Sequence, residues 1–415
     1  MIFRWEFAMM GNIMLVLKRI SAVVREGGAP LFFKKVFMRF IVRSDKNFFF
    51  HLMPKGHPVG ALKLITLSPE KKDVIIAERI MTAFHKAFAE EQSNARERKY
   101  VDAWDDNRNE YQDELIKILH SHNPESLVDY LSSMHRRKST YGVSGNITEY
   151  RRLQRNSYLR KKEVAGIKDV LVSFAEALGV LPYETVVPHV AKKNIYENSD
   201  FLVGEIENKL GIKIAPPEVE GGLFKLGLKS GSFDHRDMWS LYLAWRIKNF
   251  VSTEGSIGEI GGGLGKAALY SSRFGLRDYS IFDLPIMNVM TAWHLIKALP
   301  NEKVVLYGEP QEEKALRILP YWIFPDKKFD MIVNQDSLPE IGEEIVKDYL
   351  GKIKNCSRYF LSINHEHQAP LFPGSKHRNL VIPRLIHEVG GFTRTYRFPF
   401  WLRKGYVEEL YEVEQ

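Results

Sequence analysis

The sequence predicts an α/β fold, in which a mostly parallel, doubly wound sheet follows a mainly helical N-terminal region. From residue 256 onward, short apolar runs alternate with segments of helix-forming composition, a pattern typical of parallel strands joined by helices. Before residue 214, apolar residues recur at helical spacing. The 415 residues suffice for two or three domains, and we divide them into residues 1–67, 68–213 and 214–415.

The first segment is basic and rich in large apolar residues. Residues 1–50 hold nine Lys and Arg against three Asp and Glu. Such a segment suits either a helix packed on the body of the protein or peripheral contact with anionic lipids at the inner face of a membrane. Its longest uncharged run is eleven residues, and a membrane-spanning helix needs about 20.

Cysteine usage and the N-terminal charge order both favour the cytoplasm. Cys356 is the single cysteine of the sequence, which excludes an intrachain disulfide and a thiolate metal cluster. Lys18 and Arg19 follow the first apolar stretch instead of preceding it, which is not the order of a signal peptide.

The second segment is predicted to be helical. Ser68 is the expected N-cap, with Pro69 at the first helical position, and apolar side chains then recur at helical spacing from Ala77 to Phe88. The Gly- and Pro-rich stretch 214–232 predicts a boundary or a long loop.

The third segment carries the sheet. Apolar runs predict buried strands at 256–260, 279–283, 303–307, 329–333 and 358–363. Helices are expected between and after them at 266–274, 285–299, 343–353 and 378–389. Two strand-like runs, 392–400 and 406–414, are joined by a short Arg-Lys-Gly connection, so we expect the sheet to finish in an antiparallel hairpin.

A glycine-rich turn separates the first of these strands from a helix that begins near Lys266. In an open parallel sheet, ligands bind at the carboxyl ends of the strands, and glycine both exposes the backbone and permits positive φ angles. Asp283 ends the next strand, 18 residues after Gly265, where it can accept hydrogen bonds from both hydroxyls of a ribose. The turn and the acid together predict a nucleoside-containing cofactor.

Glu259, two residues before the first glycine, favours one such cofactor. A carboxylate there repels the pyrophosphate of a nicotinamide cofactor but suits the ammonium and sulfonium of S-adenosylmethionine. Lys266 is followed by Ala267 and not by Ser or Thr, which disfavours a nucleoside triphosphatase. The expected cofactor-binding residues are Glu259, Gly261, Gly262, Gly263, Gly265, Asp283, Leu284 and Gln335.

This pattern resembles the first two motifs of the class I S-adenosylmethionine-dependent methyltransferases. The runs IFDLPIMNVMTAWHL, VNQDSLPEI, FLSINHE and GFTRTYRFPFWLRKGYVEELYEV further resemble a family of sugar O-methyltransferases from bacterial glycan and natural-product clusters. The resemblance covers roughly residues 230–415, with a looser fit at STYGVSG. It implies a Rossmann-like class I methyltransferase domain that transfers a methyl group to a sugar hydroxyl in polysaccharide or glycosylated natural-product biosynthesis.

Methyl transfer to an alkyl hydroxyl needs a base or a metal. Asp336 and Glu340 follow the fourth predicted strand, and both face the acceptor if a helix begins near Ser337. His365 ends the fifth strand and titrates near the working pH. We expect His365 to be the general base and Asp336 to hold the acceptor; the alternatives are a helix-capping Asp336 and an ordinary loop histidine. The sequence contains no ligand set specific enough to assign a divalent metal.

Residues 134–162 hold nine Lys and Arg, one Glu and three Tyr. As a cationic wall over the cleft, this segment suits a nucleotide-, lipid- or phosphate-linked sugar. A solvated helix face, an RNA-binding surface and a different small-molecule acceptor stay open as alternatives. The tetrapeptide NQDS stands where RNA-base methyltransferases often carry Asn/Asp-Pro-Pro-Tyr/Phe, which weakens the nucleic-acid alternative. The sequence does not indicate an oligomeric state.

Overall fold

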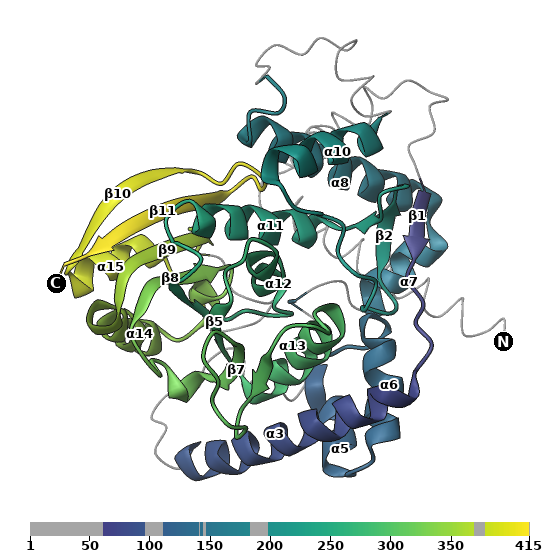
Figure 1. Ribbon diagram of the computed structural model, residues 1–415, viewed down its shortest axis with the longest axis horizontal. Helices are drawn as coiled ribbons and strands as arrows, with labels where there is room; N and C mark the ends of the chain where they lie inside the picture. The colour runs from purple at the N-terminus through teal and green to yellow at the C-terminus, as the bar shows by residue number, and fades with distance from the viewer. Residues whose placement is uncertain are drawn as a thin grey trace, which may run out of the picture. The chain divides into compact units, whose positions relative to one another are not determined.

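The computed structural model describes residues 61–95, 111–140, 142–143, 147–182, 198–368 and 378–414 (Figure 1). The chain divides into two compact units, residues 1–57 and 58–415, and every element below belongs to the second unit. The predicted lipid contact of residues 1–50 therefore lies outside the described residues. Among the helices that are described, none has the length and apolar character required to cross a membrane.

A sheet of eight strands, in the order β10-β11-β9-β8-β4-β5-β7-β6, organises the described part of the second unit. Its strands are β4 (Ser256–Ile260), β5 (Asp278–Asp283), β6 (Val304–Leu306), β7 (Leu316–Pro320), β8 (Phe329–Gln335), β9 (Ser357–His365), β10 (Phe392–Pro399) and β11 (Tyr406–Val413). Strands β4 to β9 run parallel, and β11 and β10 form an antiparallel hairpin at one edge. This arrangement confirms the predicted doubly wound fold and its closing hairpin.

Helices cover both faces of the sheet because alternate strand side chains point to opposite sides. Tyr279 and Met331 pack in the core of one face, and Phe282 and Ile332 pack in the core of the other. The helices of the first face are α11 (His235–Lys248), α12 (Lys266–Arg273) and α13 (Pro285–Ala298). Those of the second face are α14 (Glu343–Cys356) and α15 (Ile382–Val389).

The sequence prediction misses one strand. The run 303–307 forms only the short edge strand β6, and the strand beside β5 is β7, which was not predicted. Arg317 interrupts the apolar pattern of β7, yet it is 7% exposed because its guanidinium pairs with Asp278 at 2.5 Å. A paired charge therefore occupies a position that an apolar side chain normally fills.

The N-terminal part of the second unit is helical, as predicted, and packs against the sheet domain (Figure 1). Its helices are α3 (Lys71–Ala95), α5 (Asp113–His120), α6 (Pro124–Ser132), η2 (Met134–Arg136), α7 (Ile147–Arg155), α8 (Ser157–Ala177) and α10 (Ser199–Leu210). The helix α3 begins two residues after the predicted Pro69 and contacts α13, where Lys297 pairs with Asp73 at 2.6 Å.

A second, smaller sheet was not predicted. Its strands are β1 (Ala61–Leu64), β2 (Phe224–Gly227) and β3 (Ser232–Phe233). The stretch 214–232, expected to be a boundary or a long loop, contains β2, which pairs antiparallel with β1. This pairing joins the beginning of the helical region to the segment that leads into the sheet domain.

Candidate functional site

The glycine-rich turn lies between β4 and α12, at the carboxyl edge of the large sheet. Gly261, Gly263 and Gly265 have φ angles of 73°, 56° and 73°, in the left-handed region that favours glycine. A Cβ atom at Gly261 would lie 2.2 Å from Oγ of Ser337, and one at Gly265 would lie 2.7 Å from Leu295. Both conformation and space therefore require glycine at these positions.

Two side chains of α13 hold this turn by its carbonyl groups. The hydroxyl of Thr291 donates to the carbonyl of Gly263, and Nδ1 of His294 lies 2.6 Å from the carbonyl oxygen of Leu264. Because a carbonyl only accepts, Nδ1 of His294 carries the hydrogen. Burial lowers the pKa of His294 to about 4, so the ring is neutral at pH 7. The turn is thus fastened independently of any ligand.

A cavity of about 1290 Å³, including the space at its open mouth, adjoins the turn. Seven of the eight predicted cofactor-binding residues line it: Glu259, Gly261, Gly262, Gly263, Asp283, Leu284 and Gln335. The eighth, Gly265, is the N-cap of α12 and lies against Leu295 and Thr291 of α13. The sequence motif and the cavity therefore coincide.

Two carboxylates face this cavity, the buried Glu259 and the half-buried Asp283. Asp283 accepts hydrogen bonds from the backbone N–H groups of Leu284 at 2.8 Å and Gly263 at 3.1 Å. Glu259 is 4% exposed and accepts a hydrogen bond from Tyr279 at 3.0 Å. Burial raises the pKa of Glu259 to about 7 and that of Asp283 to about 6. Neither forms an ion pair with a Lys or Arg of the described residues, so a cationic ligand would relieve the cost of their burial.

Asp336 lies at the other end of the cavity with an unusual backbone. Its φ angle is 65°, and its N–H donates to the side-chain oxygen of Asn364 at 3.0 Å. One carboxylate oxygen accepts from Arg403 at 2.6 Å, and the other accepts from the hydroxyl of Tyr406. Asp336 thereby positions Arg403 and Tyr406, and its strained conformation is maintained by these contacts.

The helix that begins next to Ser337 is a single 3₁₀ turn, and Asp336 before it and Glu340 at its end both line the cavity. A short 3₁₀ helix, η4 (Leu338–Glu340), follows β8, and α14 begins only at Glu343. Pro339 lies within η4, and no side chain caps that helix, so Asp336 is not a helix cap.

Glu340, the last residue of η4, also lines the cavity. Burial, with the nearby carboxylate of Asp336, raises the pKa of Glu340 to about 8. Its carboxylate has no hydrogen-bond or ion-pair partner among the described residues. A free carboxyl group with this pKa is suited to proton transfer near neutral pH.

His365 ends β9 as predicted, but it does not line the cavity. Its ring is 5% exposed and lies 5.4 Å from the ring of Tyr406 and 3.8 Å from that of His367. Burial, with the neighbouring His367, lowers the pKa of His365 to about 4. Its action as general base stays a prediction, and the geometry favours Glu340.

Sequence reasoning missed one wall of the cavity. Arg236 and Trp239 come from the first turns of α11, and Arg403 and Tyr406 come from the β10–β11 hairpin. The guanidinium of Arg403 lies 4.5 Å from the ring of Trp239 and 3.8 Å from that of Tyr406. These residues belong to no local motif, and the only available signal was the run WLRKGY in the hairpin.

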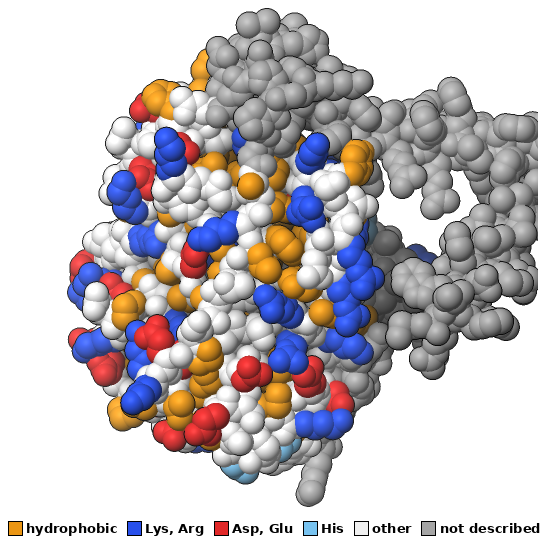
Figure 2. Space-filling view, turned by 90° about the vertical axis from the view of Figure 1, so that its right-hand side faces the viewer, with side chains coloured by type: hydrophobic (Ala, Val, Ile, Leu, Met, Phe, Trp, Pro, Cys, Tyr) orange, Lys and Arg blue, Asp and Glu red, His pale blue; other side chains and the backbone are white. Residues whose placement is uncertain are grey.

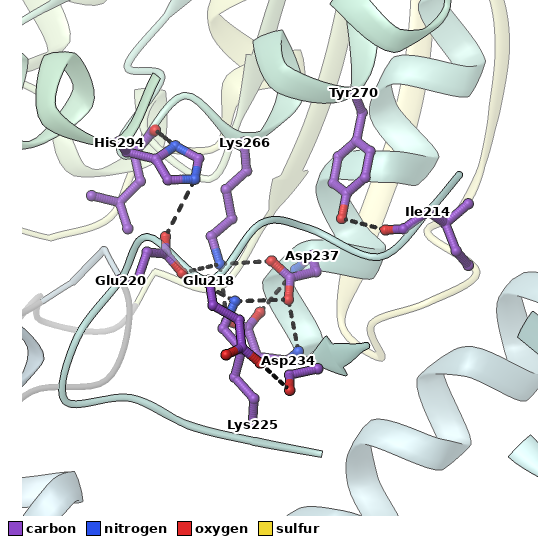
Figure 3. A network of polar contacts seen from close by, with 11 residues as sticks. Ile214, Glu218, Glu220, Lys225, Asp234, Asp237, Lys266, Tyr270 and His294 are labelled. Carbon is purple, nitrogen blue, oxygen red and sulfur yellow. Dashed lines mark hydrogen bonds and ion pairs between the residues drawn. The ribbon is translucent and has the colours of Figure 1, made fainter. Parts of the chain in front are cut away.

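Lys266 is not a phosphate-binding lysine, because its ammonium belongs to a buried ion network (Figure 3). It lies 3.1 Å from Glu220, 2.9 Å from Asp234 and 2.8 Å from Asp237. A second ammonium, that of Lys225, lies 3.2 Å from Glu220 and 3.3 Å from Asp237. These three acids are the described group whose ligand atoms lie close enough to hold a metal ion, but they already pair with the two ammoniums.

In the described residues of the basic segment 134–162, the arginines have different surroundings. Arg137 pairs with Glu114 at 3.1 Å, whereas Arg151 and Arg155 of α7 are exposed. Figure 2 shows Lys and Arg side chains gathered on the face that carries β1, α6 and α7. Within the same segment, Gly142 and Val143 line the cavity beside the glycine turn.

No family model matches the chain, and no curated protein matches its sequence. Solved structures do match. The mitomycin 7-O-methyltransferase MmcR is 14% identical over 43% of this chain and 55% of its own, with a TM-score of 0.33. The magnesium protoporphyrin IX methyltransferase ChlM from Synechocystis PCC 6803, solved with bound SAH, is 14% identical over 44% of this chain and 83% of its own, with a TM-score of 0.33. The glycopeptide N-methyltransferase MtfA, complexed with S-adenosyl-L-homocysteine, is 14% identical over 42% of this chain and 89% of its own, with a TM-score of 0.32.

The match spans 55% of the length of MmcR. At these TM-scores the likeness carries no argument about activity. The assignment of a Rossmann-like class I methyltransferase fold rests on the order and direction of the strands, with a parallel sheet centred on β4 and an antiparallel hairpin at one edge.

Proposed function

We propose that this protein is an S-adenosylmethionine-dependent methyltransferase that methylates a sugar hydroxyl. The observation that carries the proposal is a pair of carboxylates, the buried Glu259 and the half-buried Asp283, beside a glycine turn and without a cationic partner among the described residues. S-adenosylmethionine combines an ammonium, a sulfonium and a ribose, so its charge and its hydroxyls suit both acids.

The residues at the turn fit this cofactor. Asp283 would accept hydrogen bonds from the two ribose hydroxyls, and Glu259 would offset the positive charge of the amino-acid part. The bare backbone of Gly261 and Gly263 allows close contact. When bound, S-adenosylmethionine supplies an activated methyl group. The same cavity is also lined by Trp239, Arg403 and Tyr406, which can contact an acceptor.

Glu340 is the base in this proposal. It would take the proton of the acceptor hydroxyl, so the O–H bond breaks and the proton ends on the carboxylate. The acceptor oxygen would bond to the methyl carbon as the carbon–sulfur bond of the sulfonium breaks, and the electron pair would stay on the sulfur of S-adenosylhomocysteine. Because its pKa is about 8, about a tenth of the groups are ionised at pH 7, and each ionised group is a stronger base than an ordinary carboxylate.

The sugar acceptor is supported by the resemblance of residues 230–415 and by the wall opposite the turn. Trp239 offers an aromatic face, and Arg403 offers hydrogen-bond donors beside it. Aromatic faces with a few placed polar groups suit small polar ligands.

Calorimetric titration with S-adenosylmethionine, S-adenosylhomocysteine and NAD tests the cofactor. We expect micromolar binding of both S-adenosyl compounds and none of NAD. Binding of NAD alone, or of none of the three, would contradict the proposal. A panel of sugar nucleotides and glycans would then be screened for methyl acceptance.

A further inference from the structure

A second cavity, of about 880 Å³, adjoins the first. Its walls come from η2, α7 and α8 of the helical region, from β2, and from the start of α11. Both cavities are lined by Gly142, Arg236 and Trp239, so these residues mark the junction between them. A ligand longer than one sugar can therefore extend from the first cavity past Arg236 into the second.

The junction carries an unpaired cation. Arg236 is half-buried and donates to the carbonyl of Gly142 at 3.1 Å, and it forms no ion pair with a carboxylate of the described residues. The indole N–H of Trp239 is buried and has no hydrogen-bond partner in the described part of the chain. By contrast, Arg403, on the same indole ring, is already paired with Asp336 at 2.6 Å. Arg236 is therefore the available guanidinium at this point, and its planar fork suits a phosphate.

The second cavity has an aromatic wall. The rings of Tyr150 and Phe224 stack with centroids 5.6 Å apart, and both side chains are half-buried. The guanidinium of Arg136 lies 5.3 Å from the ring of Tyr150, and its Nε has no hydrogen-bond partner among the described residues. A planar heteroaromatic ring can stack against such a wall and hydrogen-bond to its edges.

Three acids line this cavity: Glu149, Glu163 and Asp234, of which Asp234 already pairs with Lys266 at 2.9 Å. Glu163 pairs with His235 at 3.1 Å, and hydrogen bonding to Glu163 raises the pKa of His235 in spite of its burial. Burial, with the nearby Glu163, raises the pKa of Glu149. Both carboxyl groups can accept hydrogen bonds from the N–H groups of a base.

We propose that the acceptor is a nucleoside-diphosphate-linked sugar, with the sugar in the first cavity, the diphosphate at Arg236 and the base against Tyr150. The inference rests on the proposed function and specifies the carrier of the sugar. The order of the three parts along such a molecule matches the order of the first cavity, the junction and the second cavity.

The test uses the full-length protein saturated with S-adenosylhomocysteine and titrated calorimetrically with UDP, CDP, GDP, ADP and inorganic pyrophosphate. At least one diphosphate is expected to bind with micromolar affinity, and at least tenfold more tightly than pyrophosphate. Arg236→Gln should weaken that diphosphate tenfold or more. Tyr150→Leu should weaken the diphosphate but not pyrophosphate.

The matched control is Arg151→Gln. It changes an exposed arginine of α7, the helix that carries Tyr150, and this arginine lines neither cavity. It should bind every probe as the wild type does. Arg236→Lys keeps the positive charge but not the planar guanidinium, so it should show an intermediate loss of diphosphate affinity. Unchanged S-adenosylhomocysteine affinity shows that each variant is folded.

Three outcomes overturn the inference: no diphosphate binds, Arg236→Gln binds diphosphates as the wild type does, or pyrophosphate binds as tightly as every nucleoside diphosphate. Titrations without S-adenosylhomocysteine separate this inference from the proposed function. Diphosphate binding that depends on Arg236, in a protein that binds no S-adenosyl compound, supports the second cavity while the proposed function fails.

Discussion

Two groups of buried carboxylates in this molecule have opposite surroundings. Glu220, Asp234 and Asp237 surround the ammoniums of Lys225 and Lys266, all at or below 8% exposure (Figure 3). Despite burial, these ammoniums hold the pKa of Asp234 well below its usual range. Beside the glycine turn, by contrast, Glu259 and Asp283 have no ammonium or guanidinium partner among the described residues, and burial raises the pKa of each.

The presence or absence of a cationic partner distinguishes acids that stabilise the fold from acids that can bind a ligand. Burying a charge is costly unless it is paired, so a chain that pairs its acids internally uses them for stability. A chain that leaves acids buried and unpaired in a cavity retains an electrostatic cost that a cationic ligand can offset. Lys266 contacts the first group and follows the glycine turn directly, so the two arrangements adjoin.

The largest effect is expected from a variant that removes one ammonium from the group of paired carboxylates. Lys266→Met leaves three buried carboxylates with one ammonium, and we expect the free energy of unfolding to fall by about 3–5 kcal/mol. Urea unfolding measures this change. Lys347→Met removes an ammonium that is 32% exposed and pairs with Glu343 at 2.9 Å, so it should cost less than about 1 kcal/mol. Equal losses in the two variants would show that pairing is not what stabilises the buried group.

Glu340 is a third unpaired acid, and its removal should affect turnover. We expect Glu340→Gln to lower kcat by about 100-fold or more, with unchanged affinity for S-adenosylhomocysteine. In the wild type, kcat should rise with pH up to about 8, because the basic form is the carboxylate and burial raises its pKa to about 8. Steady-state rates between pH 6 and 9 measure both effects, and Glu340→Gln should lose the rise.

Two further variants test whether Glu340, and not a neighbouring acid or His365, is the general base. Glu343→Gln changes an acid whose side chain is 38% exposed at the start of α14, and it should retain the wild-type rate. His365→Gln should also retain most of the rate. A large loss in His365→Gln together with an active Glu340→Gln would return the role of general base to His365.

Asp283 tests the unpaired group directly. Asp283→Ala removes the acceptor of both ribose hydroxyls, and the loss of charged hydrogen bonds should weaken S-adenosylhomocysteine binding by about 100-fold. Asp278→Ala, at the other end of β5, removes a carboxylate that pairs with Arg317 outside the cavity, and it should lower stability with little effect on affinity. If Asp283→Ala binds the ligand as the wild type does, the site assignment is wrong.

The smallest expected effect is a pH dependence of cofactor affinity. Only the ionised acids offset the positive charge of S-adenosylmethionine, so affinity should rise as pH increases through the pKa values of about 6 for Asp283 and about 7 for Glu259. We expect a rise of about tenfold between pH 5.5 and 8, measured by calorimetry. Glu259→Gln should remove the part of this rise in affinity that occurs near pH 7. A wild-type affinity that does not change with pH would contradict the charge argument.

The stability of the ligand-free protein should change in the opposite direction. The pKa values of Glu259 and Asp283 are higher in the folded protein than in an unfolded chain. The contribution of these two acids to the free energy of unfolding is therefore fully present below about pH 4, where both are protonated. It is lost as pH rises through about 7 for Glu259. Glu259→Gln should therefore make the ligand-free protein more stable than the wild type at pH 8, an effect that thermal unfolding can measure.

What the sequence predicts well is local. The strand, the glycine turn and the acid at the end of the next strand lie within 28 residues, so local spacing and charge sufficed to place Glu259 and Asp283 beside the turn. Arg236 comes from the start of α11 and Tyr406 comes from the final hairpin, so their approach depends on tertiary packing. The position of His365 at a strand end was predicted, but the rings that cover it were not.

The attachment of the glycine turn to α13 has a consequence for kinetics. Thr291 and His294 hold the carbonyls of the turn in the ligand-free protein, so little backbone ordering is left to occur when a ligand arrives. Association should then depend mainly on diffusion into the open mouth of the cavity, and exchange of spent for fresh cofactor should depend mainly on the dissociation rate. A turn that is ordered in advance allows the same site to reload quickly between successive reactions.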